Sequence, residues 1–142
     1  TPEALSLAEQ LVRQLGASAR QMQPAQHDTL LAAASHLPYL LAAALMGAAE
    51  TFGQRDPLFW ELAATGFMST SRLAASELTM MVDVLTTNQD MLLQALARAQ
   101  AELGQLRRLL SDGKEEPLRE FLAPLQRRRA GLAGRGEARH GA

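Results

Sequence analysis

Residues 29–49 form a long run of apolar side chains that only a few polar groups interrupt, among them Ser35 and His36. A helix that is apolar on most of its sides must be covered by neighbouring helices or by a membrane. Ser35, His36 and Pro38 inside the run, together with its high share of Ala, favour a helix buried in a bundle. We therefore expect this helix to be central in the fold and expect no membrane span.

The composition points to one helical domain. The chain has 142 residues, of which 47% are hydrophobic and only 4% aromatic, so the core is built from Leu, Ala, Met and Val. Leu and Ala favour helices, and β-branched residues are scarce, which predicts an all-α fold. A net charge of -1 gives no support for nucleic acid as a partner. The lack of cysteine excludes disulfides and fits a cytoplasmic location.

Start and stop signals divide the chain into helices. Pro2 and Glu3 suit the first turn of a helix that Gly16 ends. A second helix is predicted over residues 24–52, and Pro38 should kink it, because proline cannot donate a hydrogen bond to the carbonyl of Ala34.

Further helices follow along the rest of the chain. A short helix over 58–64 should end at Gly66, with residues 69–71 as caps. Ser76 is the expected N-cap of a long third helix whose apolar stripe includes Leu78, Met81, Leu85, Leu92, Leu96, Ala99, Leu103, Leu106 and Leu110. A last helix is predicted over 117–129. Residues 1–129 should therefore form the domain, and residues 130–142 a flexible Gly/Arg tail.

His36 is the first candidate functional residue. It shares a helix face with Tyr39, three residues on, and a histidine there can donate or accept a proton or hold a polar group of a ligand. A lone histidine on an apolar helix is more commonly a core residue with a satisfied hydrogen bond. His27 and His36 are nine residues apart on different faces, so no metal-ligand spacing results. Asn88 falls on the stripe of the long helix, where it needs a buried partner or faces a pocket.

Arg72 is the second candidate, because it follows a glycine-led segment rich in hydroxyl groups. Its planar guanidinium makes paired hydrogen bonds to a carboxylate. By spacing alone, a solvated surface arginine is the more common case, and the same holds for the triple arginine at 127–129.

The order of these motifs resembles the C-terminal helical domain of the prephenate/arogenate dehydrogenase family. That domain carries a pattern close to H-D-x(6)-S-H-L-P-H, then G-F-x-D-x-T-R-I-A, then a long helix with an Asn. The matching residues here, over roughly 24–110, are His27, Asp28, Ser35 to Pro38, Gly66, Phe67, Ser71 to Ala74 and Asn88. This chain departs from the family in several places: Tyr39 stands for the second His, Ser69 for the Asp, Ser71 for the Thr, and Met81 for an aromatic residue that is often found early in the long helix.

We expect an interlocked two-fold dimer, because two long, nearly all-apolar helices are more than one small bundle needs to bury. The resemblance implies a function. The function is NAD- or NADP-dependent oxidative decarboxylation of prephenate or arogenate in tyrosine biosynthesis. The resemblance assigns substrate binding to Arg72, His36, Tyr39, Ser69 and Asn88, with Arg72 holding a carboxylate. It places the catalytic histidine and the cofactor in a nucleotide-binding domain that this chain lacks, so we expect this chain alone to be inactive.

Two alternatives from another functional class remain at this stage. One is a phosphotransfer bundle in which His36 is phosphorylated; it requires an exposed histidine, whereas His36 precedes Leu-Pro in an apolar helix. The other is a plain dimerisation module attached to a different hydride-transfer enzyme. Substrate binding by the intact protein separates these alternatives from the dehydrogenase.

Overall fold

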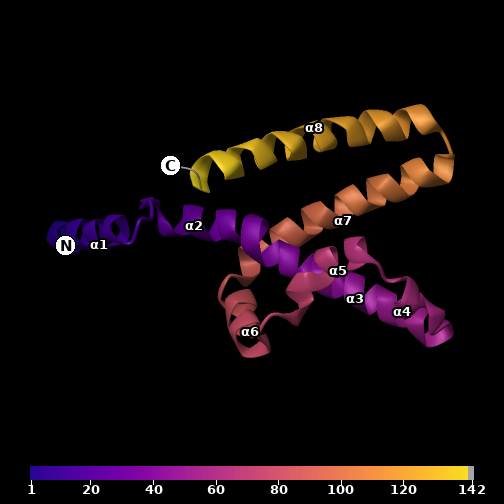
Figure 1. Ribbon diagram of the computed structural model, residues 1–142, viewed down its shortest axis with the longest axis horizontal. Helices are drawn as coiled ribbons and strands as arrows, with labels where there is room; N and C mark the ends of the chain where they lie inside the picture. The colour runs from indigo at the N-terminus through magenta and orange to yellow at the C-terminus, as the bar shows by residue number, and fades with distance from the viewer. Residues whose placement is uncertain (141–142) are drawn as a thin grey trace. The chain divides into compact units, whose positions relative to one another are not determined.

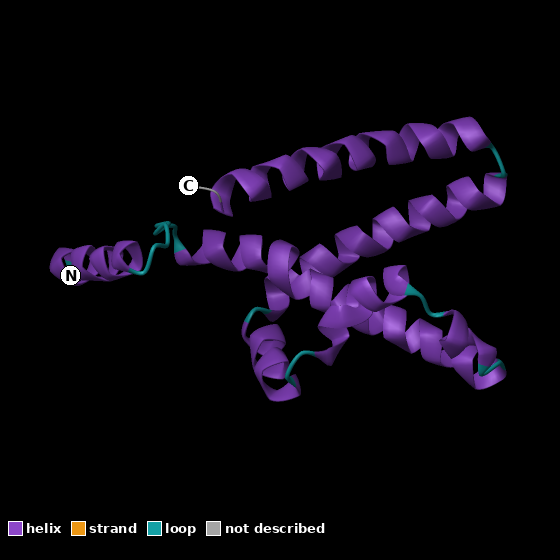
Figure 2. Ribbon diagram, in the orientation of Figure 1, coloured by secondary structure: helices purple, strands orange, loops and turns teal. Residues whose placement is uncertain are grey.

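All regular structure within the described residues is helical. The computed structural model describes the backbone of residues 1–140 and the side chains of residues 1–132, and helices account for nearly all of this range (Figure 2). The predicted all-α class is therefore confirmed. The chain divides into two compact units, Thr1–Ala95 and Leu96–Ala142, which are described separately.

The helices follow one another with short connections (Figure 1). In chain order the elements are α1 (Pro2–Gln14), α2 (Pro24–Leu31), η1 (Ala32–His36), α3 (Leu37–Arg55), α4 (Leu58–Leu62), α5 (Thr65–Ser71), η2 (Arg72–Ala75), α6 (Leu78–Thr87), α7 (Gln89–Asp112) and α8 (Glu115–His140). Of the two η elements, η1 is a π-helical turn and η2 is a 3₁₀ turn.

The ends of α1 agree with the sequence signals. Thr1 Oγ1 accepts a hydrogen bond from the Ala4 amide at 3.3 Å, and Pro2 occupies the first turn. The chain leaves the helix through Gly16, whose φ of 75° lies in the left-handed region that glycine tolerates. None of the α1 residues is buried.

Elements α2, η1 and α3 form one helical stretch, Pro24–Arg55. The predicted effect of Pro38 takes the form of a π-helical turn directly before it, in which the Leu37 amide donates to the Ala32 carbonyl. A wider turn at this place accommodates a residue that has no N–H to continue the α-helical pattern. Ala32 and His36, at the two ends of this turn, are both buried.

The prediction that this stretch is buried inside a bundle is wrong for the single chain. Only 11% of its most apolar window is buried, although the mean hydropathy of that window is 1.6. By length and composition alone this helix is also able to cross a membrane. The buried positions of α3 (Ala42, Ala49 and Gly53) lie on one face, which leaves most of the apolar surface open.

An aromatic cluster fixes the segment after α3. The rings of Phe52, Phe59, Trp60 and Phe67 contact one another with centroid distances of 5.1 to 6.3 Å. Trp60 packs so closely on α3 that a Cβ added at Gly53 would lie 2.3 Å from the indole Nε1. Gly53 is thus required by the close approach of the indole ring.

We expect Gly53→Ala to lower the free energy of unfolding by about 1–3 kcal/mol, because the indole must leave its place against α3. Thermal unfolding measures the loss, and the fluorescence of Trp60, the sole tryptophan of the chain, should shift to longer wavelength as the ring becomes more hydrated. Gly47→Ala is the matched control, since a Cβ there meets open space. Equal stability of the two variants would show that Trp60 moves at no cost.

Two predictions about the segment after α4 are wrong. Gly66 does not end a helix but lies inside α5, and residues 69–71 are not caps of the next turn. The hydroxyl groups of Ser69 and Thr70 donate to the Gly66 carbonyl, and that of Ser71 donates to Phe67. Hydroxyl side chains often satisfy themselves in this way within a short helix.

The predicted long third helix is divided in two. Asn88, with φ -117° and ψ 32°, ends α6 and separates it from α7. The N-cap of α6 is Glu77, not Ser76: its carboxylate accepts hydrogen bonds from the amides of Thr79 at 2.8 Å and Met80 at 2.6 Å. Ser76 instead donates to the Leu73 carbonyl.

The Glu77 cap makes the stability of the fold depend on pH. Hydrogen bonds from the amides of Met80 and Thr79 hold the pKa of the Glu77 carboxyl below its ordinary value. Because the folded-state pKa of Glu77 lies below its unfolded-state pKa, the ionised carboxylate stabilises the fold at pH values above the unfolded pKa. This stabilisation is lost as the pH falls through the folded-state pKa. We expect Glu77→Gln to lower the melting temperature at neutral pH and the deficit to shrink below about pH 4.5. A melting-temperature deficit that stays constant down to pH 3 would contradict this role. Glu102→Gln on α7 is the control and should show no such pH-dependent deficit.

In the second unit, α7 continues to Asp112 and a turn at Gly113, with φ 64°, leads to α8. The last helix is longer than the predicted range 117–129, since α8 spans Glu115–His140 and contains Pro124. The flexibility of residues 130–142 stays a prediction, and residues 141 and 142 lie outside the described residues.

Candidate functional site

The candidate site begins with a polar contact between two elements distant in sequence. The amide Nδ2 of Asn88 lies 3.4 Å from His36 Nδ1, across 52 positions of the chain. His36 is buried, with 9% of its surface exposed, at the end of the π-helical turn. The predicted need of Asn88 for a buried partner is therefore met by His36.

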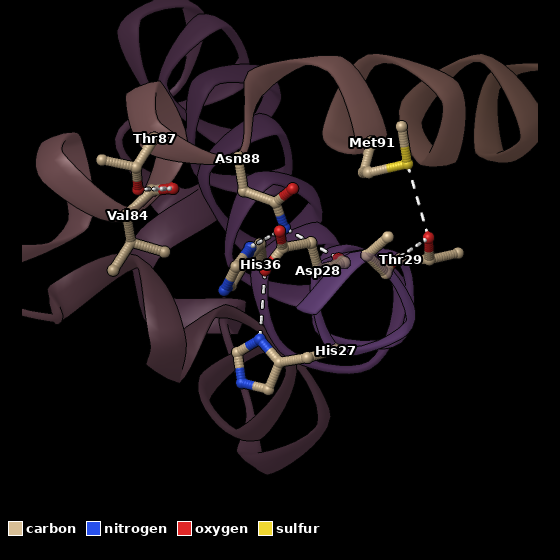
Figure 3. A network of polar contacts seen from close by, with 9 residues as sticks. His27, Asp28, Thr29, His36, Val84, Thr87, Asn88 and Met91 are labelled. Atoms are coloured by element: carbon tan, nitrogen blue, oxygen red, sulfur yellow. Dashed lines mark hydrogen bonds and ion pairs between the residues drawn. The ribbon is translucent and has the colours of Figure 1, made fainter. Parts of the chain in front are cut away.

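Asn88 also bonds to the backbone of α2. Its Nδ2 donates to the Asp28 carbonyl at 2.8 Å, and the same carbonyl accepts from the Ala32 amide at the start of the π-helical turn. Figure 3 shows the two dashed contacts of Asn88 with His36 and Asp28. One side chain at the junction of α6 and α7 thus contacts His36 at the end of the π-helical turn and the α2 carbonyl that accepts from its first residue.

His27 lies outside this contact. It is exposed and faces the Asp28 carboxylate, with Nδ1 and Oδ1 separated by 3.1 Å (Figure 3). An exposed pair of this kind contributes little to stability. Asn88 and Asp28 also line a hollow of about 320 Å³ together with Thr86, Thr87, Gln89, Asp90 and Met91.

Tyr39 and Arg72 are placed by the packing of α3. Tyr39 is half-buried in the first turn of α3, one turn after His36. The η2 turn, which starts with Arg72, packs against α3. Arg72 itself is exposed, and among the side chains that the structure describes no carboxylate forms an ion pair with it. An exposed guanidinium held on a short rigid turn remains free to bind an anion.

The hydroxyl groups before Arg72 differ in their surroundings. Ser69 is exposed, and its hydroxyl donates to the Gly66 carbonyl at 3.1 Å, so its oxygen can still accept a hydrogen bond. Ser71 is buried, with 8% exposure, and bonds back to Phe67. Ser69 is therefore the member of this pair that a ligand can reach.

Of the five predicted site residues, the structure joins His36 and Asn88 directly. It places Tyr39 beside His36 along the helix and anchors Arg72 through η2, while Ser69 makes no hydrogen bond to the other four among the described residues. Sequence reasoning missed the Asp28 carbonyl and the π-helical turn; the signal available was Pro38 in an otherwise regular apolar helix. Within the described residues, no group of three or more His, Cys, Asp or Glu forms a metal site.

Comparison with known families gives a match over most of the chain. Residues 23–124 match the family described as prephenate dehydrogenase, dimerization domain. The prephenate dehydrogenase of Bacillus subtilis (strain 168) is 27% identical over 130 residues, which cover 92% of this chain and 35% of that protein. The cyclohexadienyl dehydrogenase of Zymomonas mobilis is 29% identical, over 93% of this chain and 47% of that protein.

Solved structures give the same result. The Synechocystis arogenate dehydrogenase superposes with a TM-score of 0.80 at 31% identity, covering 93% of this chain and 48% of that one. The prephenate dehydrogenase of A. aeolicus, in complex with hydroxyphenyl propionate and NAD+, superposes with a TM-score of 0.85 at 25% identity. The match covers 93% of this chain and 46% of that one. The chain thus spans about a third to a half of the length of these relatives.

Proposed function

This chain belongs to the prephenate dehydrogenase family, and we propose that it supplies the subunit interface and part of the substrate pocket of a prephenate or arogenate dehydrogenase. The observation that carries the proposal is the family match over residues 23–124, because this range contains His36, Arg72 and Asn88 in the family's order. The relatives are two to three times longer, so the activity belongs to the intact protein.

The reaction is an oxidative decarboxylation. Hydride leaves the ring carbon that bears the hydroxyl group, the ring carboxylate departs as carbon dioxide, and the ring becomes aromatic. With prephenate as substrate, the product is 4-hydroxyphenylpyruvate. NAD or NADP, when bound to the intact protein, would supply the hydride acceptor; the NAD+ in the A. aeolicus complex supports NAD for the family. This sequence has no G-x-G-x-x-G segment to hold a dinucleotide, so we place the cofactor on another part of the intact protein.

Arg72 binds a carboxylate of the substrate in this proposal. Prephenate carries two carboxylates, and a guanidinium offers each a pair of parallel, charge-assisted hydrogen bonds. The support is that Arg72 is exposed, unpaired among the described side chains, and fixed by the packing of η2 on α3. His36, Tyr39 and Ser69 contribute hydrogen-bonding groups around the same ligand.

A second copy of the chain covers the apolar surface of α3. The exposed side of this helix contains Leu41, Ala44, Ala48 and Phe52, whose spacing of three, four and four residues places them on one face. Uncovered apolar surface of this extent marks an interface, and a two-fold axis allows the same face to serve both partners. The family's description as a dimerization domain supports this partner over a membrane.

The test is an assay of the intact protein with prephenate or arogenate and with NAD+ or NADP+. We expect reduced dinucleotide and carbon dioxide in equal amounts with at least one combination. No oxidation of either substrate would contradict the proposal, and an acid-labile phosphate on His36 after incubation with a phosphodonor would favour the phosphotransfer alternative. The cytoplasmic location stays a prediction that cell fractionation can check.

A further inference from the structure

The contact between Asn88 and His36 assigns a specific protonation state to the histidine. The Asp28 carbonyl, 2.8 Å from Asn88 Nδ2, is a backbone oxygen and can only accept a hydrogen bond. The amide group of Asn88 that faces it must therefore be the NH₂ and not the oxygen. This fixes the orientation of the amide by chemistry, since the reverse orientation would set two acceptors against each other.

The same NH₂ group faces His36. Its nitrogen lies 3.4 Å from His36 Nδ1, and an NH₂ has two hydrogens, one for each partner. Because the amide nitrogen can only donate, Nδ1 of His36 must accept. In a neutral imidazole with an accepting Nδ1, the proton resides on Nε2.

We propose that Asn88 is a positioning residue that holds His36 in its Nε2–H tautomer, so that the histidine presents a hydrogen-bond donor to the substrate. This deepens the proposed function, on which the substrate part of the inference rests. A donor at Nε2 suits an oxygen that only accepts, such as a carboxylate or keto oxygen of the substrate. It does not suit removal of a proton from a hydroxyl group, which needs an accepting nitrogen.

The surroundings of the pair explain why one tautomer is retained. His36 is buried, so water does not freely replace a lost partner at Nδ1, and an unsatisfied buried nitrogen is costly. Asn88 is itself held in place twice, by the Asp28 carbonyl and by its position between α6 and α7. The π-helical turn also holds the Asp28 carbonyl in place, because this carbonyl accepts hydrogen bonds from both the Ala32 amide and Asn88 Nδ2.

The test is nitrogen NMR of the intact protein labelled at histidine, with the His36 signals assigned from a His36→Gln variant. Wild type should show a proton on Nε2 and none on Nδ1. In Asn88→Asp, a carboxylate of nearly the same shape can only accept, so a proton should appear on Nδ1. The KM for the substrate should rise about tenfold while kcat changes less. Gln94→Glu places the same charge at an exposed position of α7 outside the hollow and should leave both the tautomer and the KM unchanged.

Two results would overturn the inference: a wild-type His36 protonated on Nδ1, or an Asn88→Asp spectrum identical to wild type. A changed tautomer with an unchanged KM would overturn the assignment of His36 as a substrate donor. The two NMR results are independent of the proposed function, because the spectrum needs no substrate, whereas the KM result depends on it. If the protein oxidises neither prephenate nor arogenate, the tautomer still decides the role of Asn88.

Discussion

Arg72→Ala in the intact protein should raise the KM for prephenate or arogenate about 10- to 100-fold. Charge-assisted hydrogen bonds contribute about 1.5–3 kcal/mol, which corresponds to this range of binding constants. The guanidinium binds a group of the substrate that does not itself react, so the loss should fall mainly on KM and less on kcat. Arg72→Lys should recover only part of the loss, because an ammonium group cannot bind a carboxylate through a planar fork.

Steady-state kinetics with each substrate measures the effect. Arg55→Ala is the matched control, since Arg55 is also exposed, is the last residue of α3 and does not belong to the motif that contains Arg72; its removal should leave KM unchanged. A KM for Arg72→Ala within twofold of wild type would remove Arg72 from the substrate site. A loss confined to kcat would mean that Arg72 acts on the reacting part of the substrate.

Ala48→Lys should convert the dimer to monomers at concentrations where wild type is paired. Ala48 lies within the exposed apolar face of α3, and a lysine there would place an unpaired ammonium group in the interface. The effective cost of burying a charge without a partner is several kcal/mol. Because the two-fold axis introduces the charge on both subunits, a loss of at least ~3 kcal/mol is expected, or about 100-fold in the dissociation constant.

Sedimentation velocity over a range of concentrations measures this change. Gln54→Lys on the same helix is the control, because Gln54 lies beside Glu50 on the polar side and already bonds to it at 3.2 Å. The control should sediment as wild type. If Ala48→Lys remains as dimeric as wild type, the exposed face of α3 is not the interface, and the apolar surfaces of α6 to α8 become the candidates.

The helical class and the ends of several helices were predictable because they depend on local signals. Pro2 and Gly16 act within one turn of their own positions, and their effects agree with the structure. The wrong predictions involve polar residues whose side chains have two possible hydrogen-bond partners close by in the sequence. Ser76 and Glu77 both suit an N-cap, and the longer carboxylate reaches the amides of Thr79 and Met80 while the serine bonds back to Leu73.

The membership of the candidate site stays a prediction from the motif order, whereas its arrangement could not be predicted from the sequence. The motif order identified His36, Arg72 and Asn88. Their geometry depends on contacts over long separations: Asn88 meets partners 52 and 60 positions earlier in the chain. No local pattern predicts that these bonds divide one apolar stripe into α6 and α7. The burial of the central helix was also wrong for the single chain, because hydrophobic periodicity shows which face needs cover but not whether the cover comes from the same chain.

The exposed apolar helix and the family match both require that a second copy of the chain covers the helix. Residues 23–124 match a dimerization domain, and within this range the most apolar window of the Pro24–Arg55 helix is only 11% buried in the single chain. Burial by a second copy would satisfy this surface and hold the helix that carries His36 and Tyr39. Dimerisation would thus stabilise the segment that we propose to bind substrate as well as the fold.

Sedimentation equilibrium of the wild-type chain at tens of micromolar tests this requirement most directly. A two-fold dimer predicts a mass of about twice 15.4 kDa, without detergent and without larger species. A mass equal to that of the single chain would contradict the dimer. A particle that becomes homogeneous only when lipid or detergent is added would assign the apolar helix to a membrane instead.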